Sequence, residues 1–342
     1  MKKGDKTKSV GVLDIAEKLN ISPSTVSRAL NDHPKISKQT KEKVLDAALK
    51  MGYNPTIPNL MVPEKSDIVA LIVPDVEKAF YRKIIEGIRE ELESNGLSLM
   101  VFISQKNEIT VEKLYDNFLK MNIRGIIYVS YSKNVSLPHL NRLSKNNIPC
   151  VIINYTQEDF PYTYVIPDIF QGAYDLTTHL VESGCRSLAL FAGSPNDLID
   201  NTVLDGFQNA LVGQDNDTVK KNVFFIPGND RPGIFNQLKA LLDGNSLPEG
   251  IVATSPEIAF IILNFLTENN VRVPEDVFLA VIGEEQDPFF FKPSLSRLVL
   301  PGKILGQMAV QELMKQLTDI NYEKHTIVHP VKFIIKNSTL RP

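Results

Sequence analysis

The chain has 342 residues, which is too long for one compact core and long enough for a small domain joined to a two-part body. Its net charge is −3. However, residues 1–66 hold 12 Lys and Arg against 7 Asp and Glu, a net charge of +5, which leaves −8 for the remainder. A basic end on an acidic body is typical of a protein that holds phosphates with one end only.

Targeting and metal signals are absent from the sequence. No apolar run reaches the ~18–20 residues of a membrane span, and no apolar segment follows the lysines of residues 1–10 as in a secretory signal. The two cysteines, Cys150 and Cys185, form neither a disulfide framework nor a metal-ligand spacing. We therefore expect a cytoplasmic protein without a metal, a cofactor or a membrane partner.

Residues 12–31 predict two short helices joined by a tight turn. Residues 12–19 carry apolar side chains at the i, i+3, i+4, i+7 spacing of one buried helix face. Asn20 can take a left-handed turn, and Ser22 followed by Pro23 is a typical start for a second helix. That helix buries Val26 and Leu30 and presents a polar face that can reach phosphates and base edges: Ser24, Thr25, Ser27 and Arg28. On these residues alone, an ordinary helical hairpin is an equal alternative.

A third helix is predicted from about Lys38 to Met51. Ser37 is its N-cap, and Gly52 and Pro55 end it. Its apolar stripe consists of Val44, Leu45, Ala48 and Leu49. Three helices can therefore share one small core.

Residues 10–55 resemble the DNA-binding headpiece of the LacI/GalR family of bacterial transcription regulators. The motifs are DIA at 14–16, STVSRALN at 24–31 and ISKQTKEKVLDAALKMGYNP at 36–55. We expect Arg28 and Ser24 to contact base edges, and Pro23 to supply shape or a methyl contact. We expect phosphate contacts from Thr25, Ser27, Asn31, Ser37 and Thr40, and we count Ser22 and Tyr53 among the DNA-binding residues.

Residues 56–66 read as a linker in which Pro58 and Pro63 bracket an apolar stretch. In the family this stretch forms a hinge helix on DNA, and a leucine from it wedges into the minor groove. Here the linker is about one residue short, and Pro58 falls within the expected helix. The hinge candidates are Leu60, Met61 and Val62, and a plain flexible linker is the alternative.

From Ser66 onward, short apolar strands alternate with helical stretches, which indicates parallel sheets covered by helices on both faces. We expect strands at 68–73, 97–103, 125–129, 148–153, 187–192, 223–226, 250–253 and 277–282, and helices at 83–95 and 111–121. Around residues 161–167 the pattern restarts, which suggests a second lobe. Ligands of such folds bind at the carboxyl ends of the strands, here in a cleft between lobes.

Residues 67–342 resemble the periplasmic-binding-protein-like sensor domain of the same regulators, with motifs such as IVALIVPD at 68–75, DIFQGAY at 168–174 and RVPEDVFLAVIG at 272–283. The predicted fold class is an all-α helix-turn-helix headpiece plus an α/β two-lobed periplasmic-binding-protein-like domain. The predicted boundaries are a headpiece at 1–55, a hinge linker at 56–66, and an effector-binding and dimerisation body at 67–342. Lobe 1 covers about 67–165 and 296–324, and lobe 2 about 166–295 and 325–342.

Enzyme and transport alternatives lack their motifs. The first strand of the body ends in Pro74-Asp75, without the glycine-rich turn of a nucleotide-binding enzyme, and no G-x-S-x-G is present. A secreted solute-binding protein would share the body, but it would have no headpiece and would carry a secretory signal, which this sequence does not show. We therefore expect a regulator and no enzyme.

The expected cleft departs from the family pattern. Phe80 and Tyr81 can stack on a flat ligand or simply pack under the helix, and Val203 stands where a ligand-contacting arginine is common. Lost charged anchors favour a neutral saccharide or polyol, then a different metabolite, then no effector at all. Glu284 and Glu285 disfavour a phosphorylated effector. The predicted ligand-binding residues are Phe80, Tyr81, Asn154, Asp168, Asn201, Ser255, Glu285 and Gln286.

A homodimer on operator DNA is expected because one headpiece reads only a half-site. Phe289, Phe290 and Phe291 are candidates for the dimer interface, with burial of two of them in the monomer core as the alternative. We expect a repressor in which lobe closure on a small molecule alters headpiece spacing, and hence affinity for double-stranded operator DNA.

Overall fold

The computed structural model divides the chain into two compact units, residues 1–64 and residues 65–342, which we call the helical unit and the body. It describes residues 11–30, 33, 35–51, 66–104, 114, 117–118, 120–131, 146, 148–154, 162–212, 219–283, 292–319 and 321–341. Several predicted sites lie outside these residues, namely Asn31, Tyr53, Leu60, Met61, Val62, Glu285, Gln286 and Phe289–Phe291.

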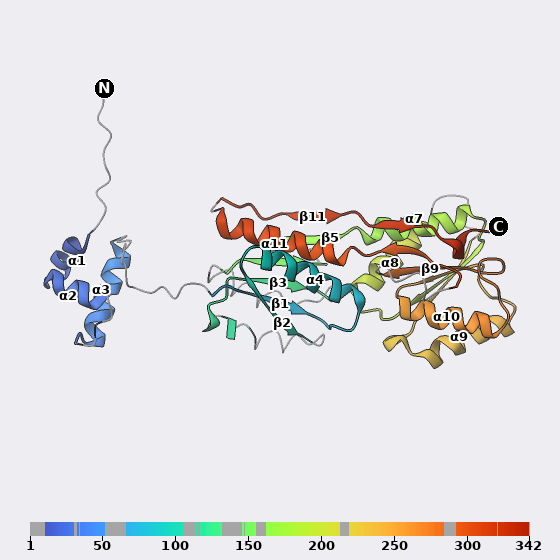
Figure 1. Cartoon of the computed structure of the whole chain (residues 1–342), viewed down its shortest axis with the longest axis horizontal. Coiled ribbons are helices and arrows are strands. Elements are labelled where there is room, and N and C mark those ends of the chain that lie inside the picture. Colours follow the sequence, from blue (N-terminus) through green and yellow to red (C-terminus); the bar gives the residue numbers. More distant parts are fainter. Residues whose placement is uncertain are drawn as a thin grey trace, which may run out of the picture. The chain divides into compact units, whose positions relative to one another are not determined.

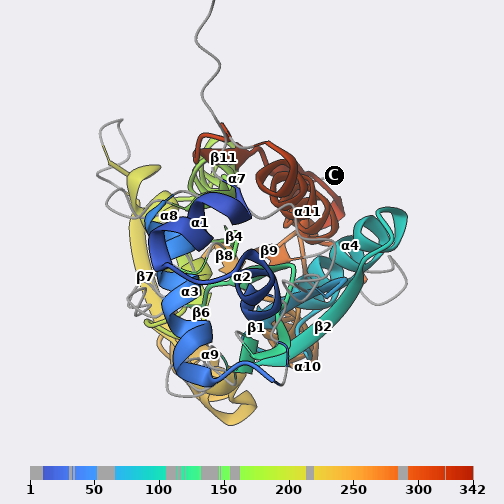
Figure 2. The same ribbon diagram turned by 90° about the vertical axis from the view of Figure 1, so that its left-hand side faces the viewer.

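The helical unit consists of α1 (Val12–Leu19), α2 (Pro23–Leu30) and α3 (Lys38–Lys50), which pack against one another (Figure 2). Its core is a single cluster of small and branched apolar side chains: Ile15, Ala16, Val26, Ala29, Leu30, Val44, Ala47 and Ala48. The three predicted helices are therefore confirmed, each to within a residue at its ends.

In this unit one predicted feature is confirmed and one is wrong. Asn20 ends α1 with a left-handed φ of 50°, as predicted. Leu45, by contrast, was predicted to be buried and is 43% exposed, whereas Ala47 is buried. The buried face of α3 runs through 44, 47 and 48, so position 45 faces away from the core.

The first lobe of the body is built on a six-stranded, all-parallel sheet with the order β11-β5-β4-β3-β1-β2. Two long helices, α4 (Ala79–Ser94) and α11 (Gly302–Thr318), cover one face of this sheet (Figure 1). Its strands are Ile68–Val73 (β1), Ser98–Ile103 (β2), Gly125–Val129 (β3), Cys150–Ile153 (β4), Thr163–Pro167 (β5) and Thr326–His329 (β11).

The second lobe carries a six-stranded sheet with the order β12-β10-β9-β8-β6-β7, in which only β12 is antiparallel to its neighbour. Its strands are Ser187–Ala192 (β6), Lys220–Phe225 (β7), Gly250–Ala253 (β8), Phe278–Gly283 (β9), Ser296–Val299 (β10) and Lys332–Ile334 (β12). Its helices are Ile169–Glu182 (α7), Leu198–Asn209 (α8), Arg231–Asp243 (α9) and Pro256–Glu268 (α10).

Alternate residues of the second-lobe strands face opposite helix layers. Leu188 and Leu190 pack in the cluster that includes α7 and α8, whereas Ala189 and Phe191 pack in the cluster that includes α9 and α10. This period of two with apolar residues on both sides is what a sheet covered on both faces requires. The predicted parallel sheets with helices on both faces are confirmed here.

The chain passes between the lobes three times, and two passages differ from the predicted boundaries. Lobe 2 was predicted to end at residue 295, but β10 belongs to the second sheet, so the passage follows Val299. Lobe 1 was predicted to end at residue 324, but β11 belongs to the first sheet, so the passage follows His329. Both strands are only four residues long, and β11 alternates exposed and half-buried residues, so neither gives a strong apolar signal.

Other predicted elements shift at their ends. The helix expected at 83–95 begins four residues earlier, at Ala79, and the strand β5, which was read as the start of the second lobe, pairs with β4 in the first. None of the described helices is both long and apolar enough to cross a membrane.

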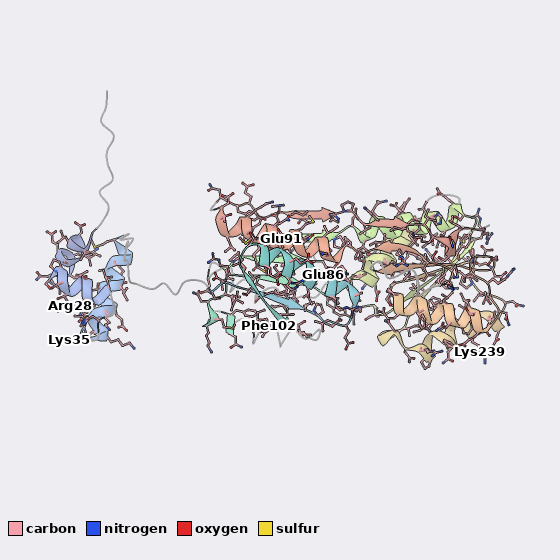
Figure 3. The ribbon with its side chains drawn as sticks, in the orientation of Figure 1. Arg28, Lys35, Glu86, Glu91, Phe102 and Lys239 are labelled. Atoms are coloured by element: carbon pink, nitrogen blue, oxygen red, sulfur yellow. The ribbon has the colours of Figure 1, made fainter. Side chains whose placement is uncertain are left out.

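Two glycines set the separation of α4 and α11. A Cβ added at Gly306 would overlap the backbone of Ile84, and one added at Gly87 would overlap the backbone of Lys303. Lys303 also pairs with Glu86 and Glu90 across the same contact, at 3.1 and 2.8 Å (Glu86 is labelled in Figure 3). The helices therefore touch through their backbones at these two points.

We expect Gly306→Ala to destabilise the body by about 1–3 kcal/mol, because the added methyl group must push two helices apart. Urea unfolding followed by circular dichroism measures the change. Ile304→Ala, at an exposed position of the same helix, is the control and should change stability by less than about 0.5 kcal/mol. Equal stability of the two variants would show that the close contact is not a constraint.

Candidate functional site

The polar face of α2 is exposed as predicted. Ser22, Pro23, Ser24 and Arg28 are exposed, Thr25 and Ser27 are half-buried, and Val26 and Leu30 are buried beneath them. Figure 3 shows the side chain of Arg28 on the helical unit. The face therefore offers hydroxyl groups at the start of the helix and one guanidinium near its end.

Both predicted N-caps form. The Ser22 hydroxyl accepts a hydrogen bond from the Thr25 amide at 3.1 Å, and the Ser37 hydroxyl accepts one from the Thr40 amide at 3.2 Å. Side-chain hydroxyls also pair at each start: Ser22 lies 2.8 Å from both Ser24 and Thr25. Thr40 lies 2.8 Å from Ser37. Amide donors and hydroxyl groups at two helix N-termini form a surface suited to phosphate groups.

A second site lies in the body, where the carboxyl ends of strands from both lobes meet. A cavity of about 60 Å³ is lined by residues that follow β1, β6, β8 and β9. It shares Lys78, Gly193, Asp197, Asp200, Asn229 and Glu257 with a wider cleft of about 480 Å³. The wider volume falls within the range of small-molecule sites.

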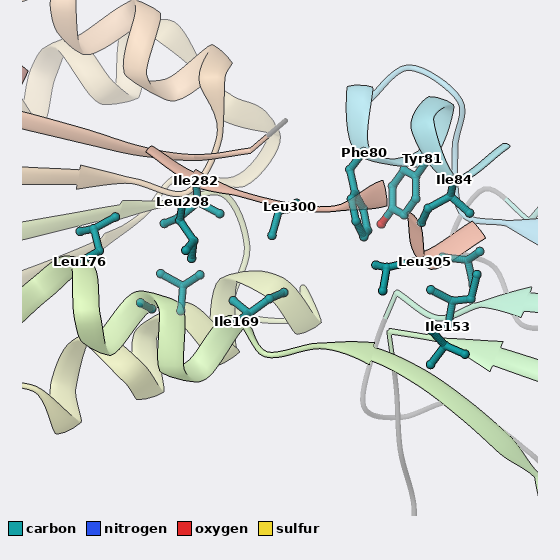
Figure 4. Close-up of a cluster of buried hydrophobic side chains, with 14 of the residues drawn as sticks. Phe80, Tyr81, Ile84, Ile153, Ile169, Leu176, Ile282, Leu298, Leu300 and Leu305 are labelled. Atoms are coloured by element: carbon teal, nitrogen blue, oxygen red, sulfur yellow. The ribbon is translucent and has the colours of Figure 1, made fainter. Parts of the chain in front are cut away.

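Three of the predicted ligand-binding residues line the inner cavity: Phe80, Tyr81 and Ser255. Phe80 and Tyr81 are 6% and 1% exposed, and their ring centroids lie 5.5 Å apart. Figure 4 shows both rings packed beside Ile84 and Leu305, with Leu300 and Ile169 extending the cluster into the second lobe. Packing under the helix therefore accounts for most of their surface.

Three other predicted residues lie outside the lining of the cavity and the cleft: Asn154, Asp168 and Asn201. Asn154 is buried in a left-handed turn and donates to the Ser130 carbonyl at 3.4 Å. Asp168 caps α7 by accepting from the Gln171 amide. Asn201 donates to the carbonyls before and at the start of α8. Each of these side chains makes hydrogen bonds within the local structure, and its role in ligand binding stays a prediction.

The polar residues that the cavity does use were not predicted. Asp197 and Asp200 are 3% and 6% exposed and begin α8, directly after the loop that follows β6. The sequence did contain a signal for them. Ligand-binding residues in this fold follow the carboxyl ends of strands, and these two aspartates come shortly after β6. Val203, in the position noted for its missing arginine, is fully buried in the same helix.

Asp197 joins the two lobes. Its Oδ2 lies 3.3 Å from Lys78 Nζ, which comes from the first lobe, and its Oδ1 accepts from the Ile199 amide. One residue further, the Leu198 amide donates to the Tyr131 carbonyl of the first lobe at 3.0 Å. Burial alone would lower the pKa of Lys78, but the carboxylates of Asp197, Asp200 and Asp75 raise it above its usual value. Lys78 therefore stays charged across the cleft.

Among the described residues, no cation forms an ion pair with the Asp200 carboxylate. Its Oδ2 accepts from the Ser194 amide at 2.7 Å. Burial, with the neighbouring Asp197 carboxylate, raises the pKa of Asp200 above 3.8. The Thr254 hydroxyl opposes this rise, although no hydrogen bond of normal geometry joins it to the carboxylate. The ionised form of Asp200 is thus held in an unfavourable place, as is typical of a functional site.

The described residues contain no group of three His, Cys, Asp or Glu side chains placed to hold a metal ion.

Comparisons with known proteins cover both units. Residues 12–56 match the model of the bacterial regulatory proteins of the lacI family. Residues 66–337 match the model of the periplasmic binding proteins and sugar binding domain of the LacI family. Among curated relatives, catabolite control protein A of Priestia megaterium is 24% identical over 335 residues, which are 97% of this chain and 99% of that protein.

Solved structures share the fold. The lac repressor dimer bound to operator and an anti-inducer has a TM-score of 0.71 at 20% identity, covering 98% of this chain and 100% of that one. A LacI family transcriptional regulator from Enterococcus faecium with bound ribose has a TM-score of 0.67 at 22% identity, covering 79% of this chain and 98% of that one.

We expect Asp200→Asn to raise the melting temperature of the ligand-free protein at pH 7. The pKa of Asp200 is raised in the folded state, so ionisation of the wild-type carboxylate lowers stability as the pH rises through that pKa. A stabilisation of roughly 1 kcal/mol, or ~2–4 °C, is the expected scale. The advantage should shrink as the pH falls from 8 toward 4, because the folded wild-type carboxyl becomes protonated as the pH falls through its raised pKa.

Differential scanning fluorimetry from pH 4 to pH 8 measures this difference. Asp243→Asn makes the same chemical change at an exposed position on α9 and should have little effect at any pH. If Asp200→Asn melts at a lower temperature than the wild type at pH 7, the buried charge of Asp200 does not destabilise the folded protein and the prediction is contradicted.

Proposed function

The chain belongs to the LacI family of bacterial regulatory proteins, and we propose that it works as a homodimeric repressor whose effector is a saccharide held in the cleft of the body. It is a DNA-binding transcriptional regulator under the control of a small molecule. We assign it no enzymatic activity, because its relatives are transcriptional regulators. It would act on the chromosome, in the bacterial cytoplasm.

The observation that carries the DNA-binding role is the exposed polar face of α2. Its buried side chains, Val26 and Leu30, fix the helix to the core, so the capped start and Arg28 are presented on a rigid support. A helix of this kind in a three-helix unit places its N-terminal residues against base edges in the major groove. We infer that Ser24 and Arg28 read bases and that the hydroxyls of Thr25, Ser37 and Thr40 hold phosphates.

A homodimer follows from the small size of this reading surface. One helix of eight residues covers only a half-site, and two-fold related half-sites give the usual affinity and specificity. The repressor dimer bound to operator among the similar structures supports the same arrangement.

A cleft effector is supported by the wall of polar residues from both lobes. Within the described part of the chain, the buried Thr254 hydroxyl makes no hydrogen bond of normal geometry, which is unusual unless a ligand or water supplies a partner. Acidic side chains on the cleft wall, Asp75, Glu77 and Glu257, disfavour phosphorylated compounds. A saccharide fits the cleft volume, and the Enterococcus faecium structure holds ribose. The ligand then shifts operator affinity by preferring one arrangement of the lobes.

Arg28→Ala should relax sequence discrimination at one base pair by roughly 1–3 kcal/mol, because a guanidinium that pairs with a guanine edge is lost. The operator is first selected from a random duplex pool with the full chain. Fluorescence anisotropy then measures the dissociation constants of the selected duplex and of its single-base variants.

Lys239→Ala is the control, because it removes one positive charge from an exposed position of the body (Figure 3) and should leave the discrimination unchanged. Equal weakening of selected and random DNA by Arg28→Ala would assign Arg28 to phosphate contact and contradict base reading.

A further inference from the structure

We propose that the effector carries an ammonium group, as in an amino sugar, and that this group binds at the inner end of the cleft among Asp200, Asn229 and Thr254. The inference rests on the proposed function, because it uses the same cleft, and it names the chemical class of the ligand.

Side-chain oxygens from the start of α8, from the turn Pro227–Asn229 and from the end of β8 line this part of the cavity. Gly193 makes the approach possible, since a Cβ there would lie 3.0 Å from Asn229 Oδ1 and 3.2 Å from Asp200 Oδ2. Asn229 is held in a left-handed conformation with φ of 54°, at the end of the short helical turn Pro227–Asn229. Thr254 follows β8 and lines the same cavity. The absence of a side chain at Gly193 therefore lets carboxylate and amide oxygens converge.

The buried Thr254 hydroxyl indicates that a hydrogen-bonding partner is supplied by a ligand. Thr254 is 6% exposed, and its Oγ1 makes no hydrogen bond within the described part of the chain. Asp200 Oδ1 likewise makes none there, because the Ser194 amide uses Oδ2. An ammonium has three donors and no acceptor, so it can satisfy a carboxylate, an amide oxygen and a hydroxyl together.

The negative charge of the cavity lining favours a cationic ligand over a neutral saccharide. Among the described residues that line the cavity and cleft, five carboxylates face a single cation: Asp75, Glu77, Asp197, Asp200 and Glu257 against Lys78. Lys78 is already paired with Asp197, and the Ser194 amide makes the only hydrogen bond of normal geometry to the Asp200 carboxylate among the described residues. A sugar hydroxyl would donate to Asp200 but leave its buried charge uncompensated, whereas an ammonium supplies a charge-assisted bond.

The bound state then contains two buried carboxylates and two cations. Lys78 keeps Asp197, and the ligand takes Asp200, so the interlobe ion pair persists when the cleft is occupied. The ring hydroxyls of the ligand face the wider cleft, where Glu257 and Ser194 lie. An amine whose charge is removed by acetylation loses both the charge and two of the three donors, and this makes the class testable.

Isothermal titration calorimetry on the full chain at pH 7 tests the assignment with three matched sets: glucosamine, galactosamine and mannosamine, each beside its parent hexose and its N-acetyl derivative. At least one free amine should bind tenfold or more tighter than both of its neutral counterparts. Asp200→Asn should weaken that amine by tenfold or more, and Thr254→Val by severalfold. Asp243→Asn, exposed on the same lobe, should bind as the wild type does.

A neutral sugar that binds as tightly as its amine would overturn the ammonium assignment and leave the cleft function standing. Binding of none of the nine compounds would also overturn it. Selected-operator binding, measured on the same samples, reports separately on the proposed function: a full chain that selects no operator would refute the regulator role, whatever the calorimetry gives.

Discussion

Parallel strand direction is the constraint on which the rest of the body depends. Eleven of the twelve strands in the described residues run parallel to a sheet neighbour, so the loops that follow them collect at one edge of each sheet. Lys78, Gly193 and Thr254 are far apart in sequence but stand on such loops, and together they line one cavity. The described residues pass between the lobes three times, and one of these passages, at Leu300, lines the same cavity together with residues of both lobes.

Two aspartates at the start of α8 make the inner end of the cleft acidic, and one of them lowers the stability of the folded protein. Asp197 is compensated by Lys78 across the lobes, and Asp200 is not compensated by any cation that the structure describes. A buried carboxylate that no cation pairs with lowers the stability of the folded state, so a neutral side chain would suit the fold alone better. The Thr254 hydroxyl, which makes no hydrogen bond of normal geometry within the described part of the chain, has the same effect.

Sequence patterns predicted much of the fold and only part of the cleft. The apolar runs of β1, β3, β6 and β8 and the helical spacing of α1 and α2 are strong local signals, and each element was placed correctly. The short, half-exposed strands β11 and β12 give no such signal, because pairing with a distant strand defines them. Asp200 and Asn229 were missed for a related reason: their convergence over Gly193 exists only in the folded chain.

The most direct test of a switch built from both units is the operator affinity of Lys78→Met in the full chain, measured by anisotropy on the selected duplex. Removal of the interlobe ion pair alters the lobes without touching a DNA-binding residue, so we expect the dissociation constant to change fivefold or more, as for typical allosteric coupling. Lys221→Met, exposed on β7, should leave it unchanged. An unchanged operator affinity for Lys78→Met, in a variant that folds normally, would contradict coupling between the cleft and the DNA-binding helices.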